Sequence, residues 1–193
     1  ICIPSPHALN ARSLAEELGL HPVQAFPRAD GTVILDSPAD LQKYRTGLLS
    51  FVRAGGRVVL TDVRDIENWL DIPIRFGGAQ FILHPLGVKP AYFVNPCTGH
   101  EWVQEFDDRD FFLWHSADSG MIEPIVSHAL KSKEMQPLLK TGIGRFRSDW
   151  TPAPAAAVRR EGRGYFVVSL VTLQGRTQTN PVAQDYALRI LGT

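Results

Sequence analysis

The sequence predicts an α/β domain in which a mostly parallel central sheet lies between helices, with an antiparallel hairpin near the C-terminus. Two observations lead to this fold class. Strand and helix patterns alternate over the first third of the chain, and two apolar arms flank a short polar turn in the last third. The length of 193 residues suits one domain with a substantial core. We therefore expect residues 1–193 to form a single domain.

The first third reads as strand, helix, strand, helix, strand. The apolar runs "ICIPSP", "TVILDS" and "RVVLTD" are typical of short buried strands. Between the second and third runs, Ser37 is a predicted helix N-cap and Pro38 suits the first helical position. Short joins imply right-handed crossovers, so we expect strands near 1–4, 32–36 and 57–61 to be parallel and central. Because the chain opens directly on a strand, we also expect it to be one domain of a longer polypeptide.

The remaining two thirds are less regular. Glycines and prolines interrupt residues 63–114, which we expect to form loops with the short strands "QFILH" and "AYFVN" over one edge of the sheet. The stretch "PAAAVRREGRGYFVVSLV" predicts a hairpin. The last segment, "NPVAQDYALRIL", predicts a helix with Asn180 as N-cap and Pro181 at its first position.

Composition argues against several classes of partner and cofactor. Acidic and basic side chains balance at 20 each, without a basic block, so we expect neither nucleic acid nor a membrane surface as a partner. Cys97 and His100 in "CTGH" are too few for a zinc site, and "FDDRD" lacks the spacing of a calcium loop. We expect no metal, no cofactor, and no disulfide between Cys2 and Cys97.

Polar residues follow each of the three expected strands at its carboxyl end. In a flavodoxin-like three-layer sandwich, ligands bind in the crevice at these ends. We therefore take this set as the candidate ligand-binding crevice, with no catalytic residue assigned. Its members are Ser5, His7, Asp36, Ser37, Asp62 and Arg64. The alternative is structural: the serines cap helices, and Asp62 and Arg64 pair with each other or with neighbours.

The tryptophans Trp69, Trp102, Trp114 and Trp150 suit either stacking on sugar rings or packing, and we expect at least two of them to pack. Histidines such as His128 have no partner at a fixed spacing, so no catalytic triad is indicated.

The stretches "GGRVVLTD", "RDFFLWHSAD" and "EGRGYFVVSLVTLQGRTQTNPVAQDYALRIL" resemble the C-terminal accessory domain of multidomain glycoside hydrolases, chiefly β-galactosidase-like members of family 2. That domain is similar in fold to class I glutamine amidotransferases. The resemblance places a nucleophilic cysteine after the strand "RVVL" and a histidine after "YFVVSLVTL". This sequence has "TDVRD" and "QGRTQTNP" there instead, so the amidotransferase chemistry is not carried over.

The resemblance therefore implies a non-catalytic accessory domain of a glycoside hydrolase. Its partners would be a catalytic barrel and β-sandwich domains of the same chain, with self-association as a further option, and the parent would be secreted or periplasmic if it degrades polysaccharides. Two alternatives stay open: a carbohydrate-binding module that uses exposed tryptophans and the crevice residues to bind an oligosaccharide, and a degenerate amidotransferase-like hydrolase that uses Asp62 with His7.

Overall fold

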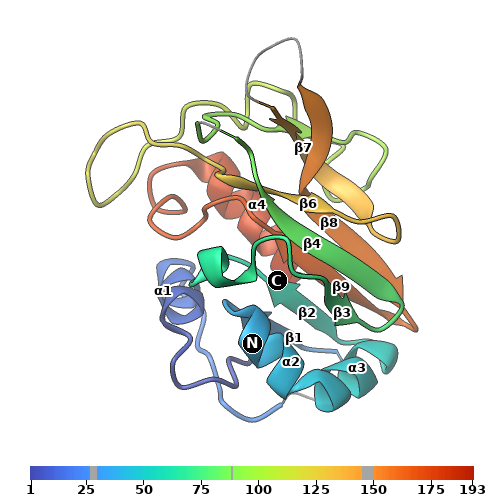
Figure 1. The fold of residues 1–193 in the computed structure, drawn as a ribbon. Helices are drawn as coiled ribbons and strands as arrows, with labels where there is room; N and C mark the ends of the chain where they lie inside the picture. Colours follow the sequence, from blue (N-terminus) through green and yellow to red (C-terminus); the bar gives the residue numbers. More distant parts are fainter. Residues whose placement is uncertain (27–29, 88, 145–149) are drawn as a thin grey trace.

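The computed structural model describes residues 1–26, 30–87, 89–144 and 150–193. It contains a six-stranded mixed sheet, a three-stranded antiparallel sheet and four α-helices in the described part of the chain (Figure 1). In spatial order, the larger sheet consists of β1 (Thr32–Leu35), β2 (Arg57–Leu60), β9 (Gly164–Ser169), β8 (Thr151–Glu161), β7 (Gln136–Ile143) and β5 (Asn95–Pro96). The smaller sheet consists of β3 (Ile74–Phe76), β4 (Ala79–Pro85) and β6 (His128–Lys131).

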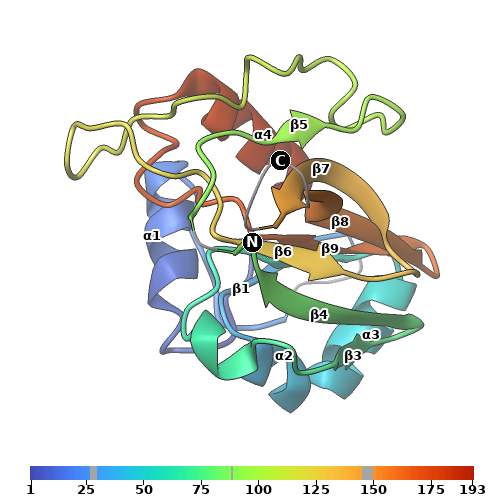
Figure 2. The same cartoon turned by 45° about the horizontal axis from the view of Figure 1, so that its top comes forward.

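The helices lie on both sides of the larger sheet. Figure 2 shows α2 (Pro38–Lys43) and α3 (Arg45–Arg53) on one side of the strands and α4 (Pro181–Leu191) on the other. A further helix, α1 (Leu9–Glu17), follows the N-terminal segment, and a 3₁₀ turn, η1 (Ile66–Trp69), follows β2. No helix of the described residues is long and apolar enough to cross a bilayer.

The expectation of a mostly parallel, flavodoxin-like sheet is wrong. Strands β1, β2 and β9 are parallel, but the pairs β9–β8, β8–β7 and β7–β5 are antiparallel. The connections explain this difference. Only Gly162 and Arg163 lie between the paired ends of β8 and β9, and so short a connection can join only antiparallel strands.

The three expected strands are parallel, as predicted, but they are not central, because β1 stands at one end of the six-stranded sheet and Cys2 pairs with its outer side. Residues 1–4 do not form a full strand. Cys2 alone forms isolated parallel bridges, one with Val33 of β1 and one with Val23. The carboxyl ends of β1, β2 and β9 therefore lie at one edge of the sheet, as the crossover rule predicts.

The structure also shows where the expected helix after Ser37, the hairpin and the two short strands lie. The helix expected after Ser37 is two helices that meet at Tyr44, the hairpin is β8–β9, and "QFILH" lies in β4. The segment "AYFVN" forms isolated bridges at Ala91 and Phe93, and its last residue, Asn95, begins the two-residue strand β5. Cys2 and Cys97 are both free thiols, as expected.

The region expected to be loops with short strands supplies β3 and β4, two of the three strands of the second sheet. Its aromatic side chains pack on the first sheet: the ring of Phe166 in β9 lies 4.4 Å from that of Phe76 in β3 and 5.9 Å from that of Phe81 in β4, between centroids. All three rings are buried. The two sheets therefore share one hydrophobic core.

Candidate functional site

Asp62 occupies the sharp turn directly after β2. Its backbone φ of 44° lies in the left-handed region, which few residues other than glycine adopt. Its carboxylate oxygen Oδ1 accepts hydrogen bonds from the N–H groups of Leu173 (2.8 Å) and Gln174 (3.1 Å), in the loop after β9. The Asp62 side chain thus fixes the ends of two neighbouring parallel strands to each other.

Burial raises the pKa of Asp62 to about 6, although the N–H groups of Leu173 and Gln174 act in the opposite direction. The negative charge of Glu17 adds to the increase in the pKa of Asp62. Glu17 itself accepts hydrogen bonds from the N–H of Gly175 (2.9 Å) and the hydroxyl of Thr177 (2.6 Å). Both carboxylates therefore bind the same loop, and each is partly satisfied by it.

The expected switch-point crevice is filled by the buried side chain of Asp36. Its carboxylate accepts hydrogen bonds from the N–H groups of Asn10 (3.0 Å) and Ala11 (3.4 Å) in the first turn of α1. It also pairs with the guanidinium of Arg64 (3.0 Å), which in turn reaches Asp40 (3.3 Å). A carboxylate suits a helix N-terminus, and here the protein supplies its own.

The other expected crevice residues take different positions. Ser37 caps α2, where its hydroxyl accepts a hydrogen bond from the N–H of Ala39 (3.2 Å). Ser5 is buried, whereas His7 is exposed and lies outside the walls of the cavities described below. Of the six residues, Asp36 and Arg64 pair directly, and Asp62 lies near them through Asn10, whose side-chain amide donates to the Asp62 carbonyl (2.8 Å).

A crevice of about 230 Å³ opens one strand further along the sheet, at the ends of β2 and β9. Its polar walls combine Asp62 with residues that are distant in the sequence: Asn10, Ser127, His128, Thr172 and Gln174. The sequence offered no local signal for His128, because it lies at the start of β6 and reaches Asp62 only through the packing of the second sheet. This polar crevice is the candidate functional site.

His128 is half-buried, and burial lowers its pKa, while Glu67 acts in the opposite direction. Its Nε2 atom lies 3.4 Å from a carboxylate oxygen of Glu67, whose side chain is exposed. A contact of this length to an exposed carboxylate holds the imidazole only weakly.

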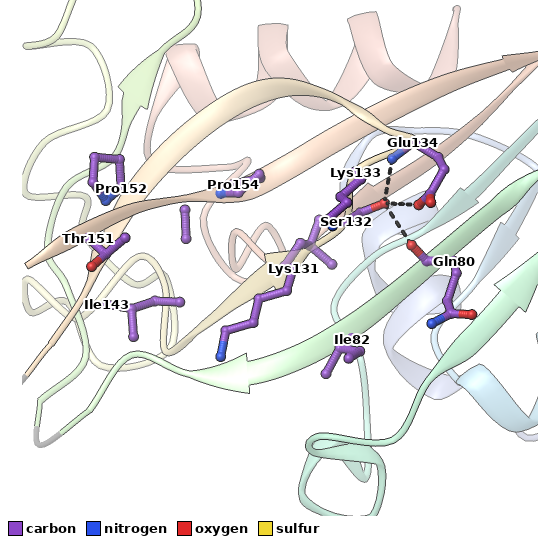
Figure 3. Close-up of a pocket in the computed structure, with 12 residues that line it drawn as sticks. Gln80, Ile82, Lys131, Ser132, Lys133, Glu134, Ile143, Thr151, Pro152 and Pro154 are labelled. Carbon is purple, nitrogen blue, oxygen red and sulfur yellow. Dashed lines mark hydrogen bonds between the residues drawn. The ribbon is translucent and has the colours of Figure 1, made fainter.

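A larger groove of about 760 Å³ lies between the β4–β6 sheet and the β7–β8 strands (Figure 3). Apolar side chains form much of it, including Ile82, Ile143 and Pro154, and none of the described residues that line it carries an aromatic ring. At one end the Ser132 hydroxyl donates to the carbonyl of Gln80 (2.7 Å) and ties the β6–β7 turn to β4. The groove has the character of a packing surface rather than of a stacking site for sugar rings.

The remaining motifs form no reactive cluster. Within the described ranges, no three His, Cys, Asp or Glu side chains are placed to hold a metal ion. Trp114 is buried, Trp69 and Trp102 pack against the core, and Trp150 is 49% exposed. The expectation that at least two tryptophans pack is confirmed.

Comparison with known proteins gave similarity at the level of structure. Neither a protein-family model nor a curated protein matched the sequence. The fold is similar to part of the cold-adapted β-galactosidase from Rahnella sp. R3, with 13% identity, a TM-score of 0.50, and coverage of 94% of this chain and 26% of that chain. The exo-β-1,4-mannosidase Op5Man5 from Opitutaceae bacterium strain TAV5 gives 12% identity, a TM-score of 0.44, and coverage of 95% and 30%.

The chain thus spans about a quarter of the β-galactosidase chain it matches. The likeness to glutamine amidotransferases gains no support, because the larger sheet is mixed rather than mostly parallel.

Proposed function

We propose that this chain is a non-catalytic structural domain of a larger glycoside hydrolase. The observation that carries the proposal is its similarity over 94% of its length to a quarter of a β-galactosidase chain. A fold that recurs as one part of a long glycosidase is expected to act together with the other domains of such a chain. Its partners would then be the catalytic and β-sandwich domains of the same polypeptide, or a second copy of it.

The acidic side chains support the non-catalytic part of the proposal. Glycoside hydrolysis needs two carboxyl groups about 5–10 Å apart across an open cleft. Asp36 is buried and paired with Arg64, and Asp62 and Glu17 each bind the loop after β9. In "FDDRD", the carboxylates of Asp107 and Asp110 accept hydrogen bonds within their own turn, from the N–H groups of Arg109 (2.7 Å) and Asp107 (2.9 Å). None of the carboxylates of Asp36, Asp62 and Glu17 is free to flank a glycosidic bond.

Exposed aromatic rings support a role in packing against another domain. Phe93 lies 6.5 Å from Phe112 and 6.3 Å from Trp150, between ring centroids, and Phe112 and Trp150 are about half exposed. Exposed apolar patches commonly mark interaction surfaces. The rings are tilted by 54° and 37°, so they form no flat platform for a sugar chain.

The proposal is tested by assaying the purified 193-residue chain and its Asp62→Asn, Asp108→Asn double variant with nitrophenyl glycosides and with glutamine. We expect no turnover above the uncatalysed rate in either protein. Turnover by the native chain that the double variant loses would contradict the proposal. A second test is to sequence the complete gene that encodes this chain. A gene that encodes no glycosidase catalytic domain would also contradict the proposal.

A further inference from the structure

The crevice at the ends of β2 and β9 is lined by both polar and apolar side chains, and the proposed structural role does not require it. Its volume of about 230 Å³ is below the range of about 300–1,000 Å³ that is usual for drug-sized ligands, so it suits a single small ring. Val63, Ile66, Leu170 and Val171 add apolar lining to its polar groups.

Several polar groups in the crevice have unused hydrogen-bonding capacity. The second carboxylate oxygen of Asp62, Oδ2, has one long contact, 3.5 Å from the Thr61 hydroxyl. The hydroxyls of Ser127 and Thr172 form no hydrogen bond within the part of the chain that the structure describes, and His128 is held only by its 3.4 Å contact with Glu67. These groups combine acceptors with donors in an open crevice, where Ser127 is exposed and Asp62, His128 and Thr172 are half-buried.

The site is also preorganised. Asp62 is fixed in a left-handed turn, and the two N–H groups that bind Oδ1 hold its side chain in one orientation. A ligand that meets a fixed carboxylate loses less free energy to side-chain ordering on binding.

The chemistry of the walls selects among classes of ligand. A half-buried carboxylate disfavours an anion, because two like charges would be desolvated together. A divalent cation needs several oxygen ligands, and no such cluster exists among the described residues. A neutral ring that carries several hydroxyl groups matches the mixed acceptors and donors and presents C–H groups to Val63 and Ile66.

We propose that this crevice binds one ring of a neutral polyhydroxyl compound, a monosaccharide unit or a cyclic polyol. Asp62 accepts hydrogen bonds from ligand hydroxyls through Oδ2, and His128 and Thr172 complete the polar wall. The inference does not depend on the chain being part of a glycosidase, since it concerns binding alone.

The test is a titration of the 193-residue chain with glucose, galactose, mannose and myo-inositol, followed by two-dimensional NMR. We expect saturable shifts for at least one of these probes, centred on His128, Thr172 and Gln174. Thr172→Val keeps the shape of the side chain and removes the hydroxyl, so we expect it to weaken binding about 2- to 10-fold. His84→Gln is the matched control, because His84 lies on β4 outside the crevice, and we expect unchanged affinity.

Three results would overturn the proposal: no saturable shift with any of the four probes, shifts centred away from the crevice, or equal affinity in Thr172→Val. Tighter binding of inorganic phosphate than of the neutral probes would also overturn it, because it would assign an anion to the site. These outcomes are independent of the turnover assay, so a failure here is distinguishable from a failure of the proposed glycosidase membership.

Discussion

Asp62 illustrates how one side chain combines a structural role with an unfavourable charge. Its Oδ1 atom is bonded by two N–H groups, yet burial raises its pKa to about 6, above the ordinary value for aspartate. The carboxylate therefore stabilises the loop after β9 through hydrogen bonds while its ionisation opposes folding.

The pKa of Asp62 predicts that part of the stability is lost as the pH rises. Because the folded state holds the proton more tightly than the unfolded state, the stabilisation is present below the unfolded pKa of about 3.9 and is lost as the pH passes through about 6. Asp62→Asn keeps an oxygen acceptor for the two N–H groups and does not titrate. We expect its stability relative to the native chain to increase by at most about 3 kcal/mol between about pH 4 and about pH 8.

Urea denaturation of both proteins at several pH values measures this difference. Glu17, whose charge acts on Asp62, and His128, which lines the same crevice, are present in both proteins. Asp108→Asn is the control, because Asp108 is exposed in a turn, and its stability should run parallel to that of the native chain. Parallel curves for Asp62→Asn as well would refute the assigned pKa.

At the scale of elements, β9 runs close to the connection between α3 and β2. A Cβ atom on Gly164 would collide with the carbonyl oxygens of Gly56 and Val52. Since both obstacles are backbone, neither can move aside cheaply. Gly164→Ala should therefore destabilise the protein by about 1–3 kcal/mol or more.

Gly47 provides the matched comparison for Gly164. It lies exposed inside α3, and a Cβ atom there would meet nothing within 4 Å. Gly47→Ala should raise the free energy of unfolding by about 0.5–1 kcal/mol, because alanine loses less conformational freedom in a helix. Thermal denaturation of the two variants distinguishes them by sign, and destabilisation by both would contradict the steric argument.

Elements with local signals could be predicted from the sequence, and elements defined by distant packing could not. The run "TVILDS", the N-cap Ser37 and the hairpin turn near Gly162 each determine their structure within a few residues. The strands β6 and β7 carry no comparable signal: β6 is four residues long, and β7 contains Pro137, which is unusual within a strand. The mixed sheet was missed for this reason.

The residues near the candidate site also differ in how far the sequence alone predicts their positions. The sequence predicts positions for Asp62 and Asp36 near each other because residues that end parallel strands follow a general rule. That rule does not say whether the protein fills the space itself, as Asp36 does with α1 and Arg64. No role for His128 is predicted from the sequence, because His128 and Asp62 line the same crevice only through the packing of the second sheet. No short sequence motif predicts how the strands of that sheet pair.

At the scale of the whole molecule, Phe166 joins the two sheets into one core. Its ring in β9 contacts Phe76 and Phe81 of the smaller sheet, and all three are fully or almost fully buried. Truncation of such a ring removes apolar contact on both sides and leaves a cavity. We expect Phe166→Ala to reduce the free energy of unfolding by about 3–5 kcal/mol.

Because the sheets share this core, neither should survive the loss of the other. Tryptophan fluorescence reports mainly on Trp69, Trp102 and Trp114, and far-ultraviolet circular dichroism reports on the backbone of both sheets. In urea, the two probes should give coincident transitions for the native chain and for Phe166→Ala, as a single cooperative unit requires. Phe112→Ala is the control, since its ring is 51% exposed and should cost less than about 1 kcal/mol. Separate transitions in the native chain would show that the smaller sheet folds independently of the parallel strands, and the crevice between them would then lack the rigidity that its proposed ligand site requires.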